Sequence, residues 1–291
     1  MRAWELLREN RRTRLMEGGN AFDDVGTIHI SEIDPTLQWL EKKLGLKNLK
    51  DGAVGSVGKV QYSGDMDIAI DPDETDIETL FGIATKALGA DSVQKHAGNI
   101  ITRVPIANYD EAKDGRQSRT GFVQVDFFPG KPEWMKTYYH SPGDTSKYRG
   151  EHRNIAVAVL ASLADTERSD EEDDLGRPID AKRWQWGGKN GLVRVHRTSR
   201  KNAKTGGWIK KQDTEVIGEP ITNADEIAKV IFRGKAGKEA LNSVETVIDA
   251  AKKGYSEDEL QQLYKKTAEG IMRHNDQWTN FDWPEELAQY M

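Results

Sequence analysis

The sequence of 291 residues contains no cysteine, which excludes disulfide bonds, thiolate metal ligands and cysteine nucleophiles. It also lacks an apolar run long enough to span a bilayer, and its start, Met-Arg-Ala-Trp-Glu, has no apolar signal-peptide core. These absences favour a cytoplasmic protein without a membrane partner. Only 8% of the residues are aromatic, but eight are tryptophans, and this length and composition predict roughly two folded domains.

Acidic residues outnumber basic ones by 48 to 42, yet one segment contains no acidic residue. Residues 182–211, the basic segment, hold ten lysines and arginines, which leaves the rest of the chain with 32 basic residues and a net charge of −16. Tryptophans among these cations offer base-stacking surfaces beside phosphate-binding groups. We therefore expect nucleic-acid binding by Lys182, Arg183, Trp184, Trp186, Arg194, Arg197, Arg200, Lys201 and Trp208. The alternative is that the acidic body binds this segment within the molecule and that the tryptophans are core residues.

The stretch Gly55–Ile70 reads as a glycine-rich loop that leads into an apolar strand. Asp65 and Asp67 stand at the start of this strand and point to one face, because side chains alternate along a strand. Two carboxylates so close together repel each other and favour a divalent cation between them, and hard oxygen ligands select Mg²⁺ or Mn²⁺. Taken alone, the pair is more typical of a solvated surface turn.

Two further features favour a metal site. The loop before the aspartates offers backbone amides, a hydroxyl and a cation, the groups that bind phosphate oxygens, from Gly55, Ser56, Gly58, Lys59 and Gly64. Downstream, residues 121–130 predict one strand that carries Gln124 and Asp126 on the face opposite its apolar residues. An aspartate in the middle of a buried strand needs a partner for its charge, and a metal shared with Asp65 and Asp67 would supply one.

These motifs resemble the polymerase beta nucleotidyltransferase superfamily. The resemblance lies in Gly55-Ser56, in Ser63-Gly64-Asp65-Met66-Asp67 and in Val125-Asp126-Phe127-Phe128-Pro129. The segment Ser-Gly-Asp-Met-Asp is most similar to the palm of family X DNA polymerases, and class I CCA-adding and poly(A) enzymes share nearly as much of the pattern. The turn at residues 138–144 resembles one that precedes a nucleotide-pocket helix in family X, which implies nucleotide contacts from Tyr139, Lys147, Arg149 and Arg153.

The resemblance covers about residues 53–163, with two departures from the family pattern. Lys59 stands where the family usually has arginine, which weakens the case for bidentate phosphate binding, and the first fifty residues show no helix-hairpin-helix signature. The resemblance implies transfer of a nucleoside monophosphate from an NTP or dNTP to a hydroxyl, at the 3′ end of DNA or RNA. It implies two ions, Mg²⁺ or Mn²⁺, held by Asp65, Asp67 and Asp126. Two alternatives stay open: a transferase that modifies a protein or small molecule, and a non-catalytic nucleic-acid-binding module.

The expected fold is α+β, a polymerase-beta-like palm with a mixed sheet, followed by a mainly helical C-terminal region that contains a basic β-hairpin. The expected domains are an N-terminal helical arm at 1–30, a catalytic domain at 31–165, an acidic linker at 166–180 and the C-terminal domain at 181–291. The hairpin is expected to turn at 201–205. Expected helices occupy 1–16, 34–45, 75–88, 151–164 and, after caps at Asn223 and Ser256, the C-terminal region, with strands at 27–30 and 99–106.

Overall fold

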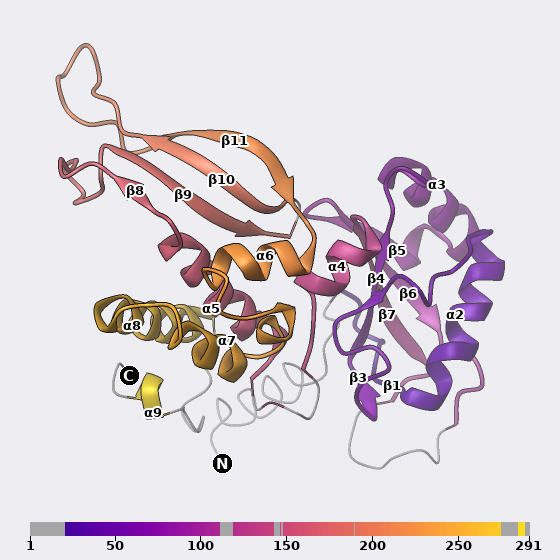
Figure 1. The fold of residues 1–291 in the computed structure, drawn as a ribbon. Coiled ribbons are helices and arrows are strands. Elements are labelled where there is room, and N and C mark those ends of the chain that lie inside the picture. The colour runs from indigo at the N-terminus through magenta and orange to yellow at the C-terminus, as the bar shows by residue number, and fades with distance from the viewer. Residues whose placement is uncertain are drawn as a thin grey trace, which may run out of the picture. The chain divides into compact units, whose positions relative to one another are not determined.

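A computed structural model describes residues 21–110, 119–142, 146, 148–188, 190–274 and 285–288 of the chain. The chain divides into two compact units, Met1–Thr145 and Ser146–Met291 (Figure 1). The predicted helix at 1–16 and the predicted site residue Lys147 lie outside the described residues. The helix at 150–163, which the sequence assigns to the end of the catalytic domain, belongs to the second unit.

The first unit is built on a mixed five-stranded sheet with the order β2-β4-β7-β6-β5. Its strands are β2 (Ala53–Val54), β4 (Asp65–Ile70), β5 (Val93–His96), β6 (Asn99–Pro105) and β7 (Phe122–Pro129). Strands β4 and β7 run parallel, and the other neighbours are antiparallel. A two-stranded sheet joins β1 (Ile28–His29) to β3 (Tyr62–Ser63). The strand at 99–106 is thus confirmed, and every second residue of β6 is buried, as the period of a strand requires.

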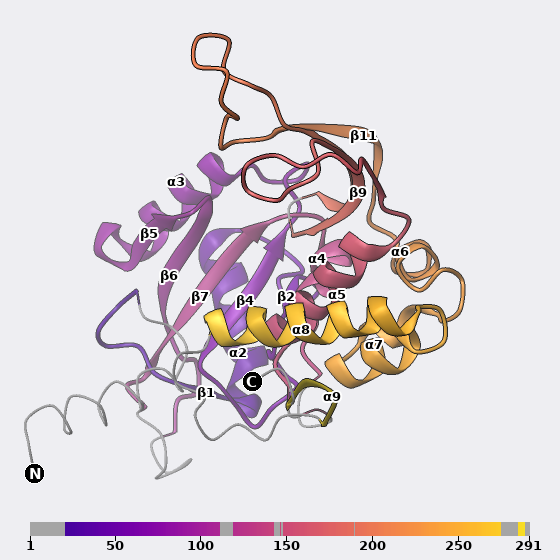
Figure 2. The same cartoon turned by 90° about the vertical axis from the view of Figure 1, so that its left-hand side faces the viewer.

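Helices α2 (Ile30–Leu44) and α3 (Ile77–Leu88) pack their apolar faces against this sheet, and the short helix α4 (Pro132–Tyr138) follows β7. The core of the first unit includes Leu37 and Leu40 of α2, Leu80 of α3 and the buried faces of β4, β6 and β7. Figure 2 shows β4 and β7 side by side in this unit. A 3₁₀ turn, Ala90–Ser92, leads from α3 into β5.

Helix α2 begins four residues before the predicted start at Asp34, although it ends at Gly45 as expected. His29 caps the helix, because its Nδ1 accepts the Ser31 N–H at 3.2 Å while the Glu32 Oε2 accepts the His29 N–H at 3.0 Å. Glu32 is buried in an ion pair with Arg119 at 2.5 Å. Pro35 therefore lies inside the helix rather than at its first position, because the capping box of His29 and Glu32 starts the helix before it.

The second unit holds a four-stranded antiparallel sheet in the order β11-β10-β9-β8, together with helices. The strands are β8 (Glu167–Arg168), β9 (Asp180–Gly187), β10 (Gly191–Thr198) and β11 (Asp213–Ile221). The helices are α5 (Gly150–Leu163), α6 (Ala224–Ile231), the 3₁₀ turn η3 (Lys238–Leu241), α7 (Val244–Ala251), α8 (Glu257–His274) and α9 (Glu285–Ala288). Asn223 caps α6 as predicted. None of the helices described is long and apolar enough to cross a membrane.

The expected hairpin with a turn at 201–205 is wrong in its register. Strand β10 pairs with β9 before it and with β11 after it, and residues 206–210 form no strand apart from an isolated bridge between Lys201 and Trp208. The sequence does not predict strand β11. Nearly all its residues are exposed, so its sequence lacks the apolar alternation of a half-buried strand.

The expected acidic linker at 166–180 is instead part of the second unit. Strand β8 pairs with β9, and the Asp173 carboxylate is buried, where it accepts hydrogen bonds from Arg177 Nε at 2.8 Å and Ser199 Oγ at 2.9 Å. Glu167 forms ion pairs with Lys182 and Arg194 of the basic segment. The acidic run folds because cations from the next strands neutralise it.

Candidate metal centre

Three aspartates converge where β4 lies beside β7. Asp67 is the parallel partner of Asp126 in the register of these strands, and Asp65 lies two residues earlier on the same face of β4. One carboxylate oxygen from each of the three lies within 4.8 Å of the others, and each side chain is half-buried. Met66, between Asp65 and Asp67, and its partner Val125, next to Asp126, are fully buried on the opposite face. The predicted common face of Asp65, Asp67 and Asp126 is therefore present in the fold.

Ionisation of all three carboxylates is unfavourable in this cluster, because they are partly buried and repel one another. Burial, and then the charges of Asp65 and Asp126, raises the pKa of Asp67 well above its usual value. Burial, and then the charge of Asp65, raises the pKa of Asp126 to about 7, against the lowering effect of a hydrogen bond from Gln124. A divalent cation bound among these oxygens would relieve both burial and repulsion. The all-oxygen donor set fits Mg²⁺ or Mn²⁺.

Gln124 holds the Asp126 carboxylate in place. Its Nε2 donates to Asp126 Oδ1 at 2.9 Å, and its Oε1 accepts the Ala21 N–H at 3.0 Å, which fixes the orientation of the amide. Gln124 is itself buried. The sequence placed Gln124 on the face of Asp126, but only the structure gives it this positioning role.

Gly55 lies directly against the metal cluster rather than in an open phosphate loop. It follows β2, whose Val54 pairs with Asp67, and a Cβ at this position would lie 2.7 Å from Asp67 Oδ2. Its φ of 67° is also unfavourable for other residues. The Gly55 N–H donates to the Tyr139 carbonyl at 3.0 Å. Glycine at position 55 therefore gives Asp67 the room that its carboxylate occupies.

The rest of the predicted phosphate loop forms a turn next to the segment that contains Tyr139. The Lys59 N–H donates to the Ser56 carbonyl at 3.0 Å, and Gly58 has a φ of 73° with nothing within 4 Å of where a Cβ would lie. The Lys59 Nζ donates to the Ser141 carbonyl at 3.4 Å. Gly64 connects β3 to β4, immediately before Asp65. The loop and the aromatic turn, far apart in sequence, thus meet beside β2.

Tyr139 is half-buried beside Phe128, with the two ring centroids 4.9 Å apart. Burial raises the pKa of its phenol to about 12, so the hydroxyl stays neutral at physiological pH. The other predicted nucleotide ligands are placed differently. Arg149 precedes α5 and Arg153 lies within it, both in the second unit, where the Arg153 guanidinium lies 5.9 Å from the Trp186 ring centre.

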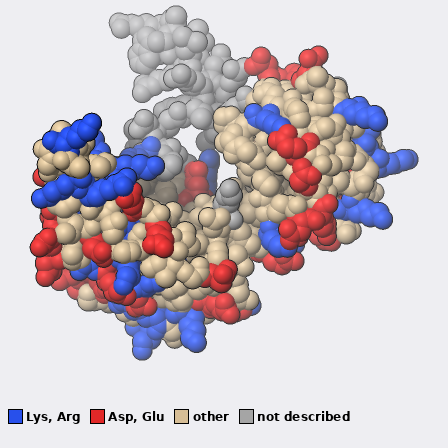
Figure 3. All heavy atoms as spheres, turned by 90° about the horizontal axis from the view of Figure 1, so that it is seen from above, with Lys and Arg blue, Asp and Glu red and all other residues tan. Residues whose placement is uncertain are grey.

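The basic segment spreads over β9, β10 and the loop that follows β10. Lysine and arginine side chains gather on the left of Figure 3, over this sheet. Several of these cations are already paired: Lys182 and Arg194 with Glu167, Arg200 with Asp213 at 3.1 Å, and Arg197 with the Gln185 side chain. Lys201 lies over the Trp208 ring. Trp186 is buried and donates to Asn154 Oδ1 at 3.1 Å, so this tryptophan is a core residue of the second unit.

Comparison with known proteins gives no family for the chain: no protein-family description matches it, and no curated protein sequence matches it significantly.

Proposed function

We propose that the protein is a metal-dependent nucleotidyltransferase and that its first unit is a polymerase-beta-like palm. The observation that carries this proposal is the cluster of Asp65, Asp67 and Asp126 on two adjacent strands, with the loop after β2 and the Tyr139 turn beside it. Three carboxylates at this separation suit two divalent ions, and a neighbouring turn with a lysine suits a triphosphate.

In the proposed reaction, a hydroxyl oxygen forms a bond to the α-phosphorus of an NTP or dNTP. The bond from that phosphorus to pyrophosphate breaks, and the hydroxyl proton passes to solvent. Asp65 and Asp67 would hold both ions, and Asp126 would join them at the ion nearest the attacking hydroxyl. When bound, the ions lower the pKa of the hydroxyl and neutralise the charge that develops on the leaving group.

The chain's own residues would position the triphosphate. Ser56 and Lys59 offer a hydroxyl and a cation at the turn after β2, and Gly58 leaves this turn open for the approach of β and γ phosphates. Gln124, by its hydrogen bond to Asp126, and Gly55, by the space it leaves for Asp67, would keep these carboxylates in place to hold the ions.

We further propose that the acceptor is the 3′ hydroxyl of a nucleic acid, held in part by the basic segment. The exposed lysines of the loop at 199–212 favour this acceptor, since Lys204, Lys210 and Lys211 face solvent. The ion pairs of Lys182, Arg194 and Arg200 favour the competing proposal of a protein or small-molecule acceptor, because they leave fewer charges for a phosphate backbone.

The test is a transfer assay with each radiolabelled nucleoside triphosphate, Mg²⁺ or Mn²⁺, and DNA, RNA or no added acceptor. We expect label to enter one nucleic acid, and Asp126→Asn to reduce the rate on the order of a hundredfold or more, because bound metal supplies most of the charge stabilisation. Asp91→Asn makes the same charge change at an exposed site of the same unit and serves as the control. Wild-type turnover in Asp126→Asn would refute the site, and label on the protein itself would identify the competing acceptor.

A further inference from the structure

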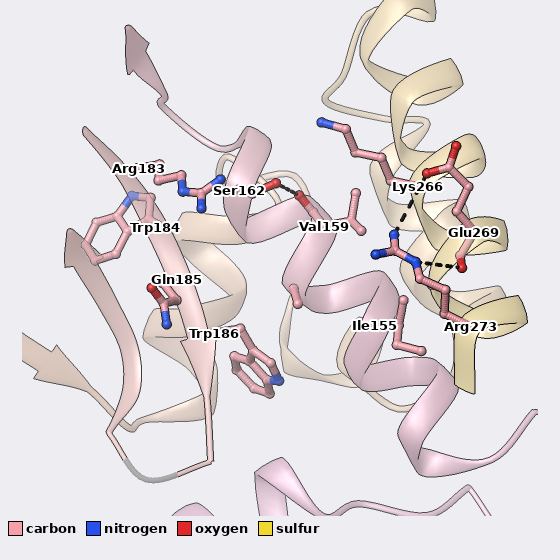
Figure 4. Close-up of a pocket in the computed structure, with 12 residues that line it drawn as sticks. Ile155, Val159, Ser162, Arg183, Trp184, Gln185, Trp186, Lys266, Glu269 and Arg273 are labelled. Atoms are coloured by element: carbon pink, nitrogen blue, oxygen red, sulfur yellow. Dashed lines mark hydrogen bonds and ion pairs between the residues drawn. The ribbon is translucent and has the colours of Figure 1, made fainter. Parts of the chain in front are cut away.

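A cavity of about 560 Å³ lies within the second unit, between strand β9 and the helices α5 and α8. Figure 4 shows Ile155 and Val159 of α5 on one side of it, Arg183 reaching in from β9, and Lys266 and Arg273 on α8. Its volume lies in the range of sites for ligands of nucleotide size. The cavity contains none of the three aspartates and forms a separate candidate site.

The polar lining of this cavity is predominantly cationic. Arg183, Lys266 and Arg273 contribute three positive charges, whereas Glu269 contributes one carboxylate, which lies 4.0 Å from Arg273. Burial, and then the charge of Arg197, lowers the pKa of Arg183. Burial, and then the charges of Arg183 and Arg168, lowers the pKa of Lys266, against the raising effect of the Glu269 charge. Both shifts have the cause expected where like charges are drawn together and partly removed from water, an arrangement that an anion stabilises.

Arg183 differs from the other arginines of the basic segment in its partners. Arg194 and Arg200 form ion pairs with carboxylates, and Arg197 donates to the Gln185 side chain. Within the part of the chain that the structure describes, no carboxylate forms an ion pair with Arg183, and Lys266 feels the charge of Glu269 on the same helix without forming an ion pair with it. A half-buried guanidinium that lacks a carboxylate partner and is directed into a cavity is a candidate ligand for a phosphate, since its planar fork matches two phosphate oxygens.

We propose that this cavity binds the phosphate group of a nucleotide, either free or as part of a nucleic-acid strand. Arg183 and Lys266 would hold the phosphate, and the apolar side chains of α5 would contact the sugar or base. This inference rests on the proposed function for its choice of a nucleotide over other phosphates. It requires neither bound metal nor catalysis, so the two proposals can fail independently.

The test measures binding of short fluorescein-labelled DNA and RNA oligonucleotides to the full chain by fluorescence anisotropy, in EDTA. We expect Arg183→Gln to weaken binding roughly tenfold or more, the loss typical of a charge-assisted hydrogen bond. Lys266→Gln should weaken it severalfold and make the dependence of log K on log salt shallower by about one. Lys266 is more exposed than Arg183, so this variant keeps the test decisive if Arg183→Gln fails to fold, which its thermal melt would reveal.

Lys265→Gln is the matched control, because Lys265 is the exposed neighbour of Lys266 on α8 and does not line the cavity. Wild-type affinity in Lys266→Gln would overturn the proposal. An equal loss of affinity in Lys265→Gln would also overturn it, because it would show that only the overall charge matters. Unlabelled AMP and inorganic phosphate then serve as competitors. If AMP displaces the labelled oligonucleotide from the wild type, the site binds a free nucleotide. If the Arg183 and Lys266 variants lose oligonucleotide binding but AMP does not displace the oligonucleotide from the wild type, the site binds a strand. Displacement by inorganic phosphate as effective as by AMP would overturn the assignment to a nucleotide.

Discussion

At the scale of single residues, the metal cluster depends on neighbours that bind nothing themselves. Gly55 leaves room for the Asp67 carboxylate, and Gln124 donates to Asp126. The cluster also depends on charge, because burial and the charge of Asp65 raise the pKa of Asp126 to about 7, so that a proton competes with a cation for this carboxylate near neutral pH. Both features lead to predictions that need no knowledge of the substrate.

Gly55→Ala should weaken metal binding, because its Cβ would meet Asp67 Oδ2 at 2.7 Å. Gly58→Ala is the matched control, since Gly58 has a similar φ of 73° but nothing within 4 Å of an added Cβ. Each variant should lose about 1 kcal/mol of stability from the left-handed backbone. Only Gly55→Ala should also lose affinity for Mn²⁺, measured by titration calorimetry without nucleotide. Equal Mn²⁺ affinity in both variants would refute the positioning role.

Metal binding should strengthen as the pH rises from 6 to 8, because the ion must displace the proton of Asp126. A group with a pKa of about 7 implies roughly tenfold weaker apparent affinity at pH 6 than at pH 8, and the raised pKa of Asp67 acts in the same direction. Without metal, this raised pKa gives a contribution to stability that is full below the unfolded pKa and is lost as the pH rises through about 7. Thermal melts with and without Mn²⁺ should therefore show a larger stabilisation by metal at pH 8. A shift that is the same at both pH values would contradict this assignment.

At the scale of elements, the acidic run at 166–180 shows how partners convert an apparent linker into structure. Strand β8 pairs with β9, and the Asp173 carboxylate accepts hydrogen bonds from the Leu175 and Arg177 main chains as well as from the Arg177 and Ser199 side chains. These contacts hold a turn whose acidic composition is typical of a solvent-exposed linker.

Limited proteolysis with trypsin tests this element, because Arg168, which precedes Ser169, provides a cleavage site in it. We expect the native protein to resist cleavage at Arg168, since paired backbone is a poor protease substrate. Asp173→Ala should accelerate cleavage at Arg168, because it removes the acceptor shared by several partly buried donors. Asp174→Ala, at the exposed next position, should leave the cleavage rate unchanged. Rapid cleavage of the wild type at Arg168 would instead support a linker.

At the scale of the whole molecule, charge is divided unevenly along the chain. The net charge of −6 combines a strongly acidic remainder with a basic segment that lies entirely in the second unit. Ion pairs within that unit use part of the basic charge, and the exposed lysines of the loop at 199–212 keep the rest in solvent.

If these lysines contact a phosphate backbone, the affinity for an oligonucleotide should fall as salt rises. Replacing Lys204, Lys210 and Lys211 together by glutamine should then make the log–log slope shallower by up to about three. The control replaces Lys42, Lys43 and Lys47, which are exposed in the first unit and change the net charge equally. Anisotropy titrations over a range of salt concentrations measure both slopes. Identical slopes in the two triple variants would show that the loop makes no phosphate contact.

The sequence by itself determined those features that depend on neighbours a few residues away. The period of a strand placed Asp65 and Asp67 on one face, the apolar run around Asp126 indicated a strand, and Gly45 and Asn223 marked a helix end and a helix start. These signals are local, because side-chain alternation and helix capping depend on residues only a few positions apart.

Only the tertiary structure decided which distant segments meet. The parallel register of β4 and β7 sets Asp126 opposite Asp67, the pair Glu32–Arg119 accompanies the early start of α2, and α8 brings Lys266 to the cavity that Arg183 enters. No local pattern encodes these contacts, since strand register and long-range ion pairs follow from how the whole chain buries its apolar surface and compensates its buried charges.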